Sequence, residues 1–150
     1  MNLNPRRQKI QAADSQVPII LAVEDDVDNL LFISHALILL KFDFITAEDS
    51  KTAFDLATKY EIDLVLLDLV LPEMSGFELA SQLRQNVLTQ DMPIIAVSGL
   101  AKQQDYDRAL SSGCNDYLCK PYLIDDLETK ICQHLPHYKQ ARFKQNLKVK

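Results

Sequence analysis

The stretch from residue 63 to residue 76 constrains the fold more than any other part of the chain. It reads Asp-Leu-Val-Leu-Leu-Asp-Leu-Val-Leu-Pro-Glu-Met-Ser-Gly, a short apolar run around Asp68 that is closed by Pro72 and Gly76. A half-exposed strand would alternate apolar and polar residues, whereas a continuous short run fits a parallel strand buried on both faces. Asp68 therefore lies at the end of a buried strand, where its charge needs a compensating partner.

Strand and helix patterns alternate along the rest of the chain. Four further apolar runs predict strands at 18–23, 42–47, 93–98 and 115–119, and helical patterns cover 28–41, 50–60, 76–86, 101–112 and 123–134. Asp28 is the expected N-cap of the first helix, and Gly113 the expected C-cap residue of the fourth. Five such pairs predict an α/β fold, a doubly wound parallel five-stranded (βα)5 sheet with helices on both faces. In the flavodoxin-like strand order 2-1-3-4-5, strands one and three are neighbours.

The length and charge of the chain indicate one domain. With 150 residues, 47% of them hydrophobic, we expect a single domain at 18–135, a polar N-terminal extension at 1–17 and a basic C-terminal tail at 136–150. Residues 18–136 contain 8 basic and 20 acidic residues, which argues against nucleic-acid binding through the fold. No apolar run approaches the ~20 residues of a membrane span, and the start resembles no secretory signal, so we expect a cytoplasmic protein without a membrane partner.

The cysteines and histidines suggest no chemistry of their own. Cys114, Cys119 and Cys132 are odd in number and lack metal-type spacing, which favours free thiols in a reducing compartment. The three histidines, at 35, 134 and 137, have no ligand partners at useful spacing, and we interpret them as surface or packing residues.

Chemically distinctive residues follow four of the five predicted strands. Glu24 and Asp25 follow the first strand, Asp68 ends the third, Ser98 ends the fourth and Lys120 follows the fifth. Because parallel strands end at the same edge of a sheet, we expect these groups to converge. Clustered carboxylates favour a hard divalent cation such as Mg²⁺, and a metal, an ammonium and a hydroxyl together suit a phosphoryl group. Asp68, at the centre, is then the nucleophile of an aspartyl phosphate.

Four motifs in this order resemble the receiver domain of two-component response regulators, of the stand-alone chemotaxis type. They are Val-Glu-Asp-Asp at 23–26, Leu-Leu-Asp-Leu-Val-Leu-Pro-Glu-Met-Ser-Gly at 66–76, Ala-Val-Ser-Gly at 96–99 and Gly-Cys-Asn-Asp-Tyr-Leu-Cys-Lys-Pro at 113–121. The resemblance covers roughly residues 18–135. Because no DNA-binding or enzymatic domain is evident after residue 135, a single-domain regulator is the expectation.

The resemblance implies roles for the clustered residues. Asp68 would accept a phosphoryl group from a sensor histidine kinase or a histidine phosphotransfer protein. Asp25, Asp68 and the backbone carbonyl of Val70 would bind Mg²⁺, with Glu24 helping through water, and Lys120 would pair with the phosphoryl oxygens.

The resemblance also implies how the signal leaves the site. Ser98 would move to hydrogen-bond the phosphate, and Tyr117 would turn inward. The face formed by the helix at 101–112, the strand at 115–119 and the helix at 123–134 would then change shape and bind a downstream protein. A homodimer is a further possibility, and a cis peptide bond is expected between Lys120 and Pro121.

Some positions depart from the usual pattern of the family. Ser98 replaces a threonine, Glu24 replaces an aspartate and Ser75 stands where an aspartate is usual. The first helix, whose inner stripe is Leu30, Ile33, Leu37 and Leu40, is also unusually apolar, since Phe32, Ala36 and Leu39 lie off that stripe. This excess indicates either extra packing or a docking face for the kinase or a second copy of the chain.

Two other functions remain open. The first is a receiver-like docking module that works without phosphorylation. The second is a phosphatase or phosphotransferase with an aspartate nucleophile, similar to the haloacid dehalogenase group, although Val70 occupies the place of the second aspartate in the Asp-x-Asp motif of that group. The expectation is no turnover of an external substrate.

Overall fold

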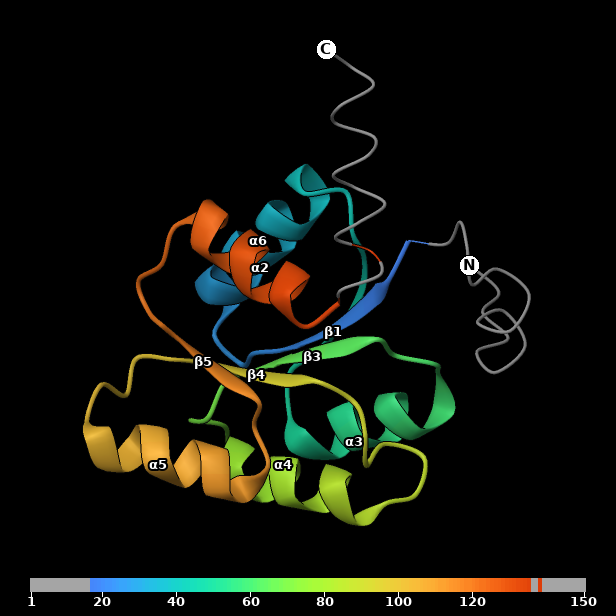
Figure 1. The fold of residues 1–150 in the computed structure, drawn as a ribbon, viewed down its shortest axis with the longest axis vertical. Coiled ribbons are helices and arrows are strands. Elements are labelled where there is room, and N and C mark those ends of the chain that lie inside the picture. The colour runs from blue at the N-terminus through green and yellow to red at the C-terminus, as the bar shows by residue number, and fades with distance from the viewer. Residues whose placement is uncertain (1–16, 136–137, 139–150) are drawn as a thin grey trace.

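Five parallel strands form the centre of the protein in the computed structural model, which describes residues 17–135 and residue 138. The strands are β1 (Ile19–Val23), β2 (Asp43–Ala47), β3 (Leu64–Leu67), β4 (Ile94–Ser98) and β5 (Asp116–Cys119). Their order in the sheet is β2-β1-β3-β4-β5, and every neighbouring pair is parallel (Figure 1). The predicted doubly wound sheet and its strand order are confirmed.

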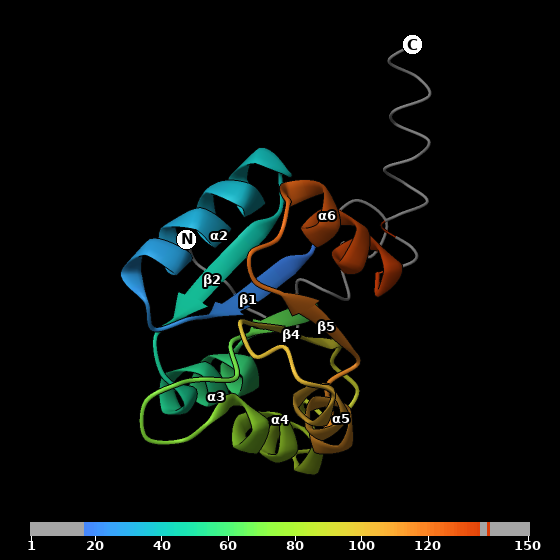
Figure 2. The same cartoon turned by 90° about the vertical axis from the view of Figure 1, so that its left-hand side faces the viewer.

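Helices cover both faces of this sheet. They are α2 (Val27–Leu39), α3 (Ser50–Lys59), α4 (Gly76–Gln85), α5 (Gln103–Ser112) and α6 (Ile124–Gln133). Figure 2 shows α2 and α6 on one face and α3, α4 and α5 on the other. The loops that lead from the strands into these helices therefore surround the site at the carboxyl edge of the sheet.

Burial on both faces explains why the strand sequences do not alternate. Every residue of β1, β3 and β4 is buried. In β3, Leu66 packs into the core cluster that includes α2 and α6, whereas Leu67 packs into the cluster that includes α3 and α4. A parallel strand between two helical layers has no solvent-facing side, so both alternating sets of positions are apolar.

The first helix differs from its prediction at both ends. It begins at Val27 with Asp26 as the N-cap, whose Oδ2 accepts a hydrogen bond of 2.9 Å from the backbone N–H of Asn29. The prediction that Asp28 caps the helix is therefore wrong. The helix ends at Leu39 instead of at residue 41, because Lys41 adopts a left-handed conformation with φ of 64°.

Ala36 was predicted to lie off the inner stripe of this helix, and that prediction is wrong. Ala36 is fully buried, in the cluster that also contains Leu127 and Ile131 of α6. The inner face of α2 is wider than one stripe because the helix packs against both the sheet and α6. Phe32 and Leu39 lie off the inner face, as predicted, and they are exposed, as are Val27, Leu31 and Ile38.

The predicted N-terminal extension, apart from Val17, and the basic tail, apart from Tyr138, lie outside the described residues, as does His137. The Tyr138 ring packs against Phe42, with ring centroids 5.2 Å apart. Over the part of the chain that the structure describes, every helix is too short or too polar to span a bilayer.

Candidate functional site

Three carboxylates converge at the carboxyl edge of the sheet. Val23, at the end of β1, pairs with Leu67, at the end of β3, so Glu24, Asp25 and Asp68 leave the sheet side by side. One carboxylate oxygen from each acid lies within 4.8 Å of those of the other two. Glu24 and Asp68 are buried, whereas Asp25 is exposed. The arrangement can hold one hard cation that remains accessible from solvent.

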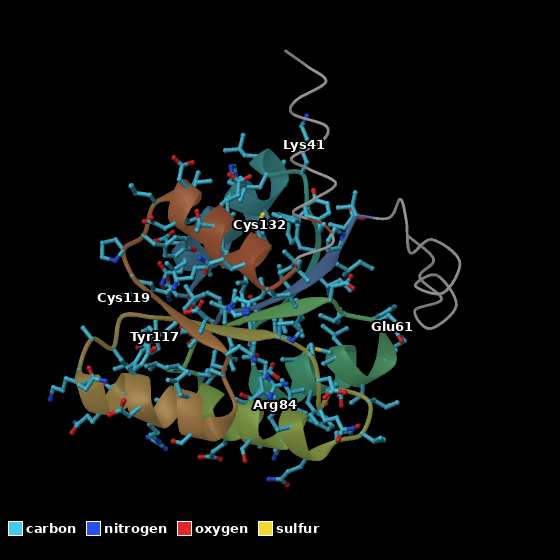
Figure 3. The ribbon with its side chains drawn as sticks, viewed as in Figure 1. Lys41, Glu61, Arg84, Tyr117, Cys119 and Cys132 are labelled. Atoms are coloured by element: carbon cyan, nitrogen blue, oxygen red, sulfur yellow. The ribbon has the colours of Figure 1, made fainter. Side chains whose placement is uncertain are left out.

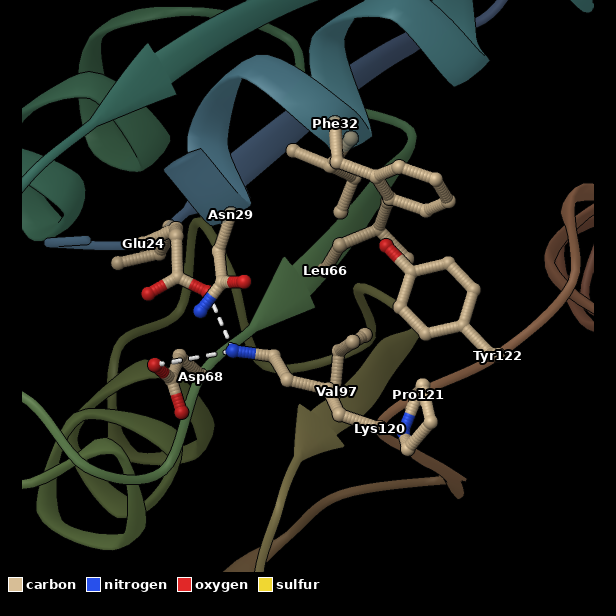
Figure 4. A pocket seen from close by; sticks show the side chains of 11 residues that line it. Glu24, Asn29, Phe32, Leu66, Asp68, Val97, Lys120, Pro121 and Tyr122 are labelled. Carbon is tan, nitrogen blue, oxygen red and sulfur yellow. Dashed lines mark hydrogen bonds and ion pairs between the residues drawn. The ribbon is translucent and has the colours of Figure 1, made fainter. Parts of the chain in front are cut away.

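Lys120 supplies the positive charge of this site. Its Nζ lies 2.5 Å from Oε1 of Glu24 and 3.4 Å from Oδ2 of Asp68 (Figure 4). Burial opposes the charge of Lys120, but the hydrogen bond to Glu24 and the negative charge of Asp68 outweigh it and raise the lysine pKa. The pKa of Glu24 is also raised, first by burial and then by its hydrogen bond with Asp68. The expected cis bond between Lys120 and Pro121 is confirmed.

The backbone around Asp68 fixes the position of its carboxylate. The N–H of Asp68 donates to the carbonyl of Val23 at 3.0 Å, and its Oδ1 accepts from the N–H of Val70 at 3.1 Å. Gly76 passes directly behind this segment, where an added Cβ would lie 2.3 Å from the carbonyl oxygen of Asp68. The segment that follows β3 therefore folds back, so that its closing glycine packs against the end of the strand. The Val70 side chain is exposed beside Asp68.

Ser98 and Tyr117 both hydrogen-bond to the backbone of Leu100, next to the acidic cluster. Ser98 is fully buried at the end of β4, and its Oγ accepts a hydrogen bond of 3.3 Å from the N–H of Leu100. The Tyr117 hydroxyl donates to the carbonyl of the same Leu100. Tyr117 lies on the side of the sheet that faces α5, and its ring packs 5.9 Å from that of Tyr106 (Figure 3). Burial raises the pKa of its hydroxyl, which stays protonated at neutral pH.

The structure thus brings together Glu24, Asp25, Asp68 and Lys120, and it links Ser98 to Tyr117 through the backbone of Leu100. The Lys120–Glu24 ion pair was not predicted from the sequence, because spacing alone cannot rank the possible partners of a cation. The N-cap role of Ser75, which accepts from the N–H of Glu78 at 3.3 Å, was also missed. A serine followed by glutamate three residues later at a helix start could have indicated it.

The cysteines match their prediction. Cys114, Cys119 and Cys132 are free thiols. Burial raises the pKa of the Cys114 thiol to about 11, which keeps it protonated and unreactive at neutral pH.

Known proteins with similar sequences match this chain over only part of their own length. The chain is 37% identical over 116 residues to a probable cyclic di-GMP phosphodiesterase of Vibrio cholerae, a match that covers 77% of this chain and 26% of that protein. It is 36% identical over 112 residues to the transcriptional regulatory protein KdpE of Staphylococcus aureus, covering 75% and 47%. The chain spans about a quarter to a half of the length of the curated relatives it matches.

Solved structures show the same fold. The receiver domain of a sensor histidine kinase of Pseudomonas aeruginosa, described with a magnesium ion in its active site cleft, matches with a TM-score of 0.76 and 29% identity over 81% of this chain and 99% of that one. A CheY-like receiver domain protein of Methanospirillum hungatei matches with a TM-score of 0.75 and 26% identity over 83% and 99%.

The family described as the response regulator receiver domain matches residues 20–132, a range that runs from the second residue of β1 to the last residue but one of α6. This chain therefore belongs to the receiver domain family of two-component response regulators.

Proposed function

We propose that Asp68 accepts a phosphoryl group from a phosphohistidine on a partner, a sensor histidine kinase or a histidine phosphotransfer protein. The observation that carries the proposal is the position of the Asp68 carboxylate, buried between the ammonium group of Lys120 and a second acid, Asp25. An acid in this position can act as a nucleophile. A phosphoryl group that approaches it meets the positive charge of the lysine on one side and oxygen atoms that can bind a cation on the other.

The residues present fit Mg²⁺. Asp25 and Asp68 offer carboxylate oxygens, the backbone carbonyl of Val70 offers a third oxygen, and Glu24 would act through water because its own carboxylate is paired with Lys120. All-oxygen ligands with several retained waters suit this ion. When bound, Mg²⁺ would supply positive charge against the phosphoryl oxygens. The magnesium described in the related Pseudomonas structure supports the assignment.

The reaction is an in-line displacement. A carboxylate oxygen of Asp68 forms a bond to phosphorus, the phosphorus–nitrogen bond breaks, and its electron pair stays on the imidazole of the partner. Lys120 already lies 3.4 Å from Asp68, and its ammonium pairs with an oxygen of the transferred group. A preset charge of this kind needs little reorganisation during the reaction.

The output is a change in a protein-binding face. Ser98 moves its hydroxyl from Leu100 to the phosphoryl group, and this frees the loop that also anchors Tyr117. The face formed by α5, β5 and α6 then changes shape and binds a downstream protein. The exposed aromatic ring of Tyr106 on α5, packed against Tyr117, is part of that face.

The partner that donates the phosphoryl group docks on the exposed apolar side of α2. This side consists of Val27, Leu31, Phe32, Ile38 and Leu39. The helix begins directly after the acidic residues that follow β1, so a partner packed on it reaches Asp68. Leu31→Ser should slow transfer from the partner but not from acetyl phosphate. Sedimentation of the purified protein tests the alternative that a second copy covers this side.

Intact-mass spectrometry tests the central proposal. The protein is incubated with Mg²⁺ and acetyl phosphate or phosphoramidate, and one phosphoryl adduct is expected in the wild type and in Asp116→Asn, an aspartate at the other end of β5, but none in Asp68→Asn. No adduct with either donor would favour a docking module that works without phosphorylation. We propose that the chain turns over no external phosphoester, and sustained turnover would indicate a phosphatase or phosphotransferase instead.

A further inference from the structure

A pocket of about 500 Å³ opens beside the acidic site, between α2 and the segment that follows β5 (Figure 4). Its volume is in the range of sites that hold small molecules. Its lining consists of Val23, Glu24, Asn29, Phe32, Ile33, Leu66, Asp68, Val97, Lys120, Pro121 and Tyr122.

Most of the wall is apolar and rigid. Val23, Leu66 and Val97 come from three adjacent strands and are almost fully buried. Phe32 of α2 and Tyr122 form two aromatic sides, with ring centroids 5.4 Å apart in an edge-to-face arrangement. A flat apolar group would be enclosed on several sides by groups that are already held in place.

The hydroxyl of Tyr122 has an unmet hydrogen-bonding capacity. It is directed toward Leu66 and Phe32, into the pocket, and within residues 17–135 no hydrogen bond satisfies it (Figure 4). Burial and the nearby charge of Glu24 raise its pKa to about 12, so the hydroxyl is protonated at neutral pH and can both donate and accept. Tyr122 is half-buried, so an occupant that displaces water from this side of the pocket would have to supply a polar atom to its hydroxyl.

The charged groups at the inner end of the pocket are already paired with one another. The ammonium of Lys120 contacts the carboxylates of Glu24 and Asp68, so the apolar remainder of the pocket offers no unpaired charge to an ionic occupant. We propose that this pocket binds a small uncharged aromatic molecule with one polar group, which hydrogen-bonds the Tyr122 hydroxyl while its ring packs against Phe32.

Such an occupant would lie against groups that we assign to phosphoryl acceptance. Glu24, Asp68 and Lys120 all line the inner end of the pocket. A bound molecule and a phosphoryl group on Asp68 would therefore change each other's affinity, because coupling between two sites is reciprocal. This regulatory consequence rests on the proposed function, whereas binding itself does not.

Indole is a suitable probe because it is neutral, has a single N–H and fluoresces, while the chain contains no tryptophan. Titration of the protein into indole, excited where tyrosine does not absorb, should give a saturable change in fluorescence. Tyr122→Phe, which removes only the hydroxyl, should weaken binding by about fivefold, the size of one net hydrogen bond. Phe32→Ala should weaken it further, because it removes one aromatic side.

Leu39→Ala is the matched control, since Leu39 is exposed on the same helix but outside the pocket. It should bind as the wild type does. The titration contains neither Mg²⁺ nor a phosphoryl donor, which separates this result from the phosphoryl-adduct experiment. Circular dichroism checks that each variant is folded. Saturable binding that folded Tyr122→Phe and Phe32→Ala both weaken supports the proposal. Non-saturable binding, or binding unchanged in both folded variants, overturns it.

Discussion

The ammonium group of Lys120 is held by Glu24, with 2.5 Å between Nζ and Oε1, and this contact is shorter than the 3.4 Å between Nζ and Asp68. The two residues are 96 positions apart, and their side chains are almost enclosed. Glu24 thus holds the lysine beside Asp68, the proposed phosphoryl acceptor. A carboxylate one bond longer than the aspartate usual at this position reaches across the site to do so.

Replacing Lys120 should slow phosphoryl acceptance. Lys120→Gln keeps the length of the side chain but removes the charge that would face the phosphoryl oxygens, and we expect adduct formation to slow by about 100-fold. The measurement is the rate of adduct formation with acetyl phosphate and Mg²⁺. Lys130→Gln is the control, because Lys130 pairs with Asp116 at the opposite end of β5. Equal rates in the two variants would contradict the role of Lys120.

Gly76→Ala should destabilise the protein because a Cβ has no room there. The added carbon would lie 2.3 Å from the carbonyl oxygen of Asp68 and 2.7 Å from the Cα of Leu69, and both are backbone atoms. We expect the free energy of unfolding in urea to fall by about 3 kcal/mol. Gly99→Ala is the matched control, since nothing lies within 4 Å of its Cβ position. Its change should stay within about 0.5 kcal/mol.

Arg84→Lys should also be destabilising, because Arg84 joins three segments far from the acidic site. Its guanidinium donates to the carbonyl oxygens of Gly113, Gln90 and Met92 and to the side chain of Asn115, over distances of 2.6 to 3.0 Å. Lysine cannot reproduce this fork, and we expect a loss of about 2 kcal/mol in urea unfolding. Phosphoryl acceptance by the folded variant should not change, since Arg84 lies at the amino ends of the strands, opposite the acidic site.

Asp116 should contribute a pH-dependent part of the stability. Burial opposes its charge, but hydrogen bonds from His134 and Lys130, each 2.9 Å long, outweigh burial and lower its pKa. A carboxylate with a lowered folded pKa stabilises the fold above the ordinary aspartate pKa of about 3.9, and loses that contribution as the pH falls through the folded value.

Asp116→Asn should therefore reduce the free energy of unfolding by about 2 kcal/mol at pH 7. The difference from the wild type should shrink as the pH falls below about 4. Urea titrations at several pH values measure this difference, and a constant difference over the whole range would contradict the ion pair. Asp107→Asn, on the exposed surface of α5, is the matched control.

The pattern of apolar runs and helical stretches was enough to predict the sheet. Continuous apolar runs such as that of β3 occur only where both faces are covered, and the helical stretches between them force right-handed parallel connections. The carboxyl ends of parallel strands share one edge, so the meeting of Asp25, Asp68 and Lys120 also followed from the order of the elements. The spacing of the motifs was enough because these residues leave the sheet directly at strand ends.

The side-chain contacts within the site could not be predicted from local patterns, because they depend on how distant elements pack. The pairing of Lys120 with Glu24 depends on side-chain length and burial across residues far apart in the chain, and no local pattern encodes it. Ala36 was misplaced because it shares a core cluster with residues of α6, which lies far along the chain and is invisible to the periodicity of α2. The pocket that ends at Tyr122 could not be predicted for the same reason. A cavity is formed by the packing of elements against one another, whereas sequence patterns record the preferences of one element at a time.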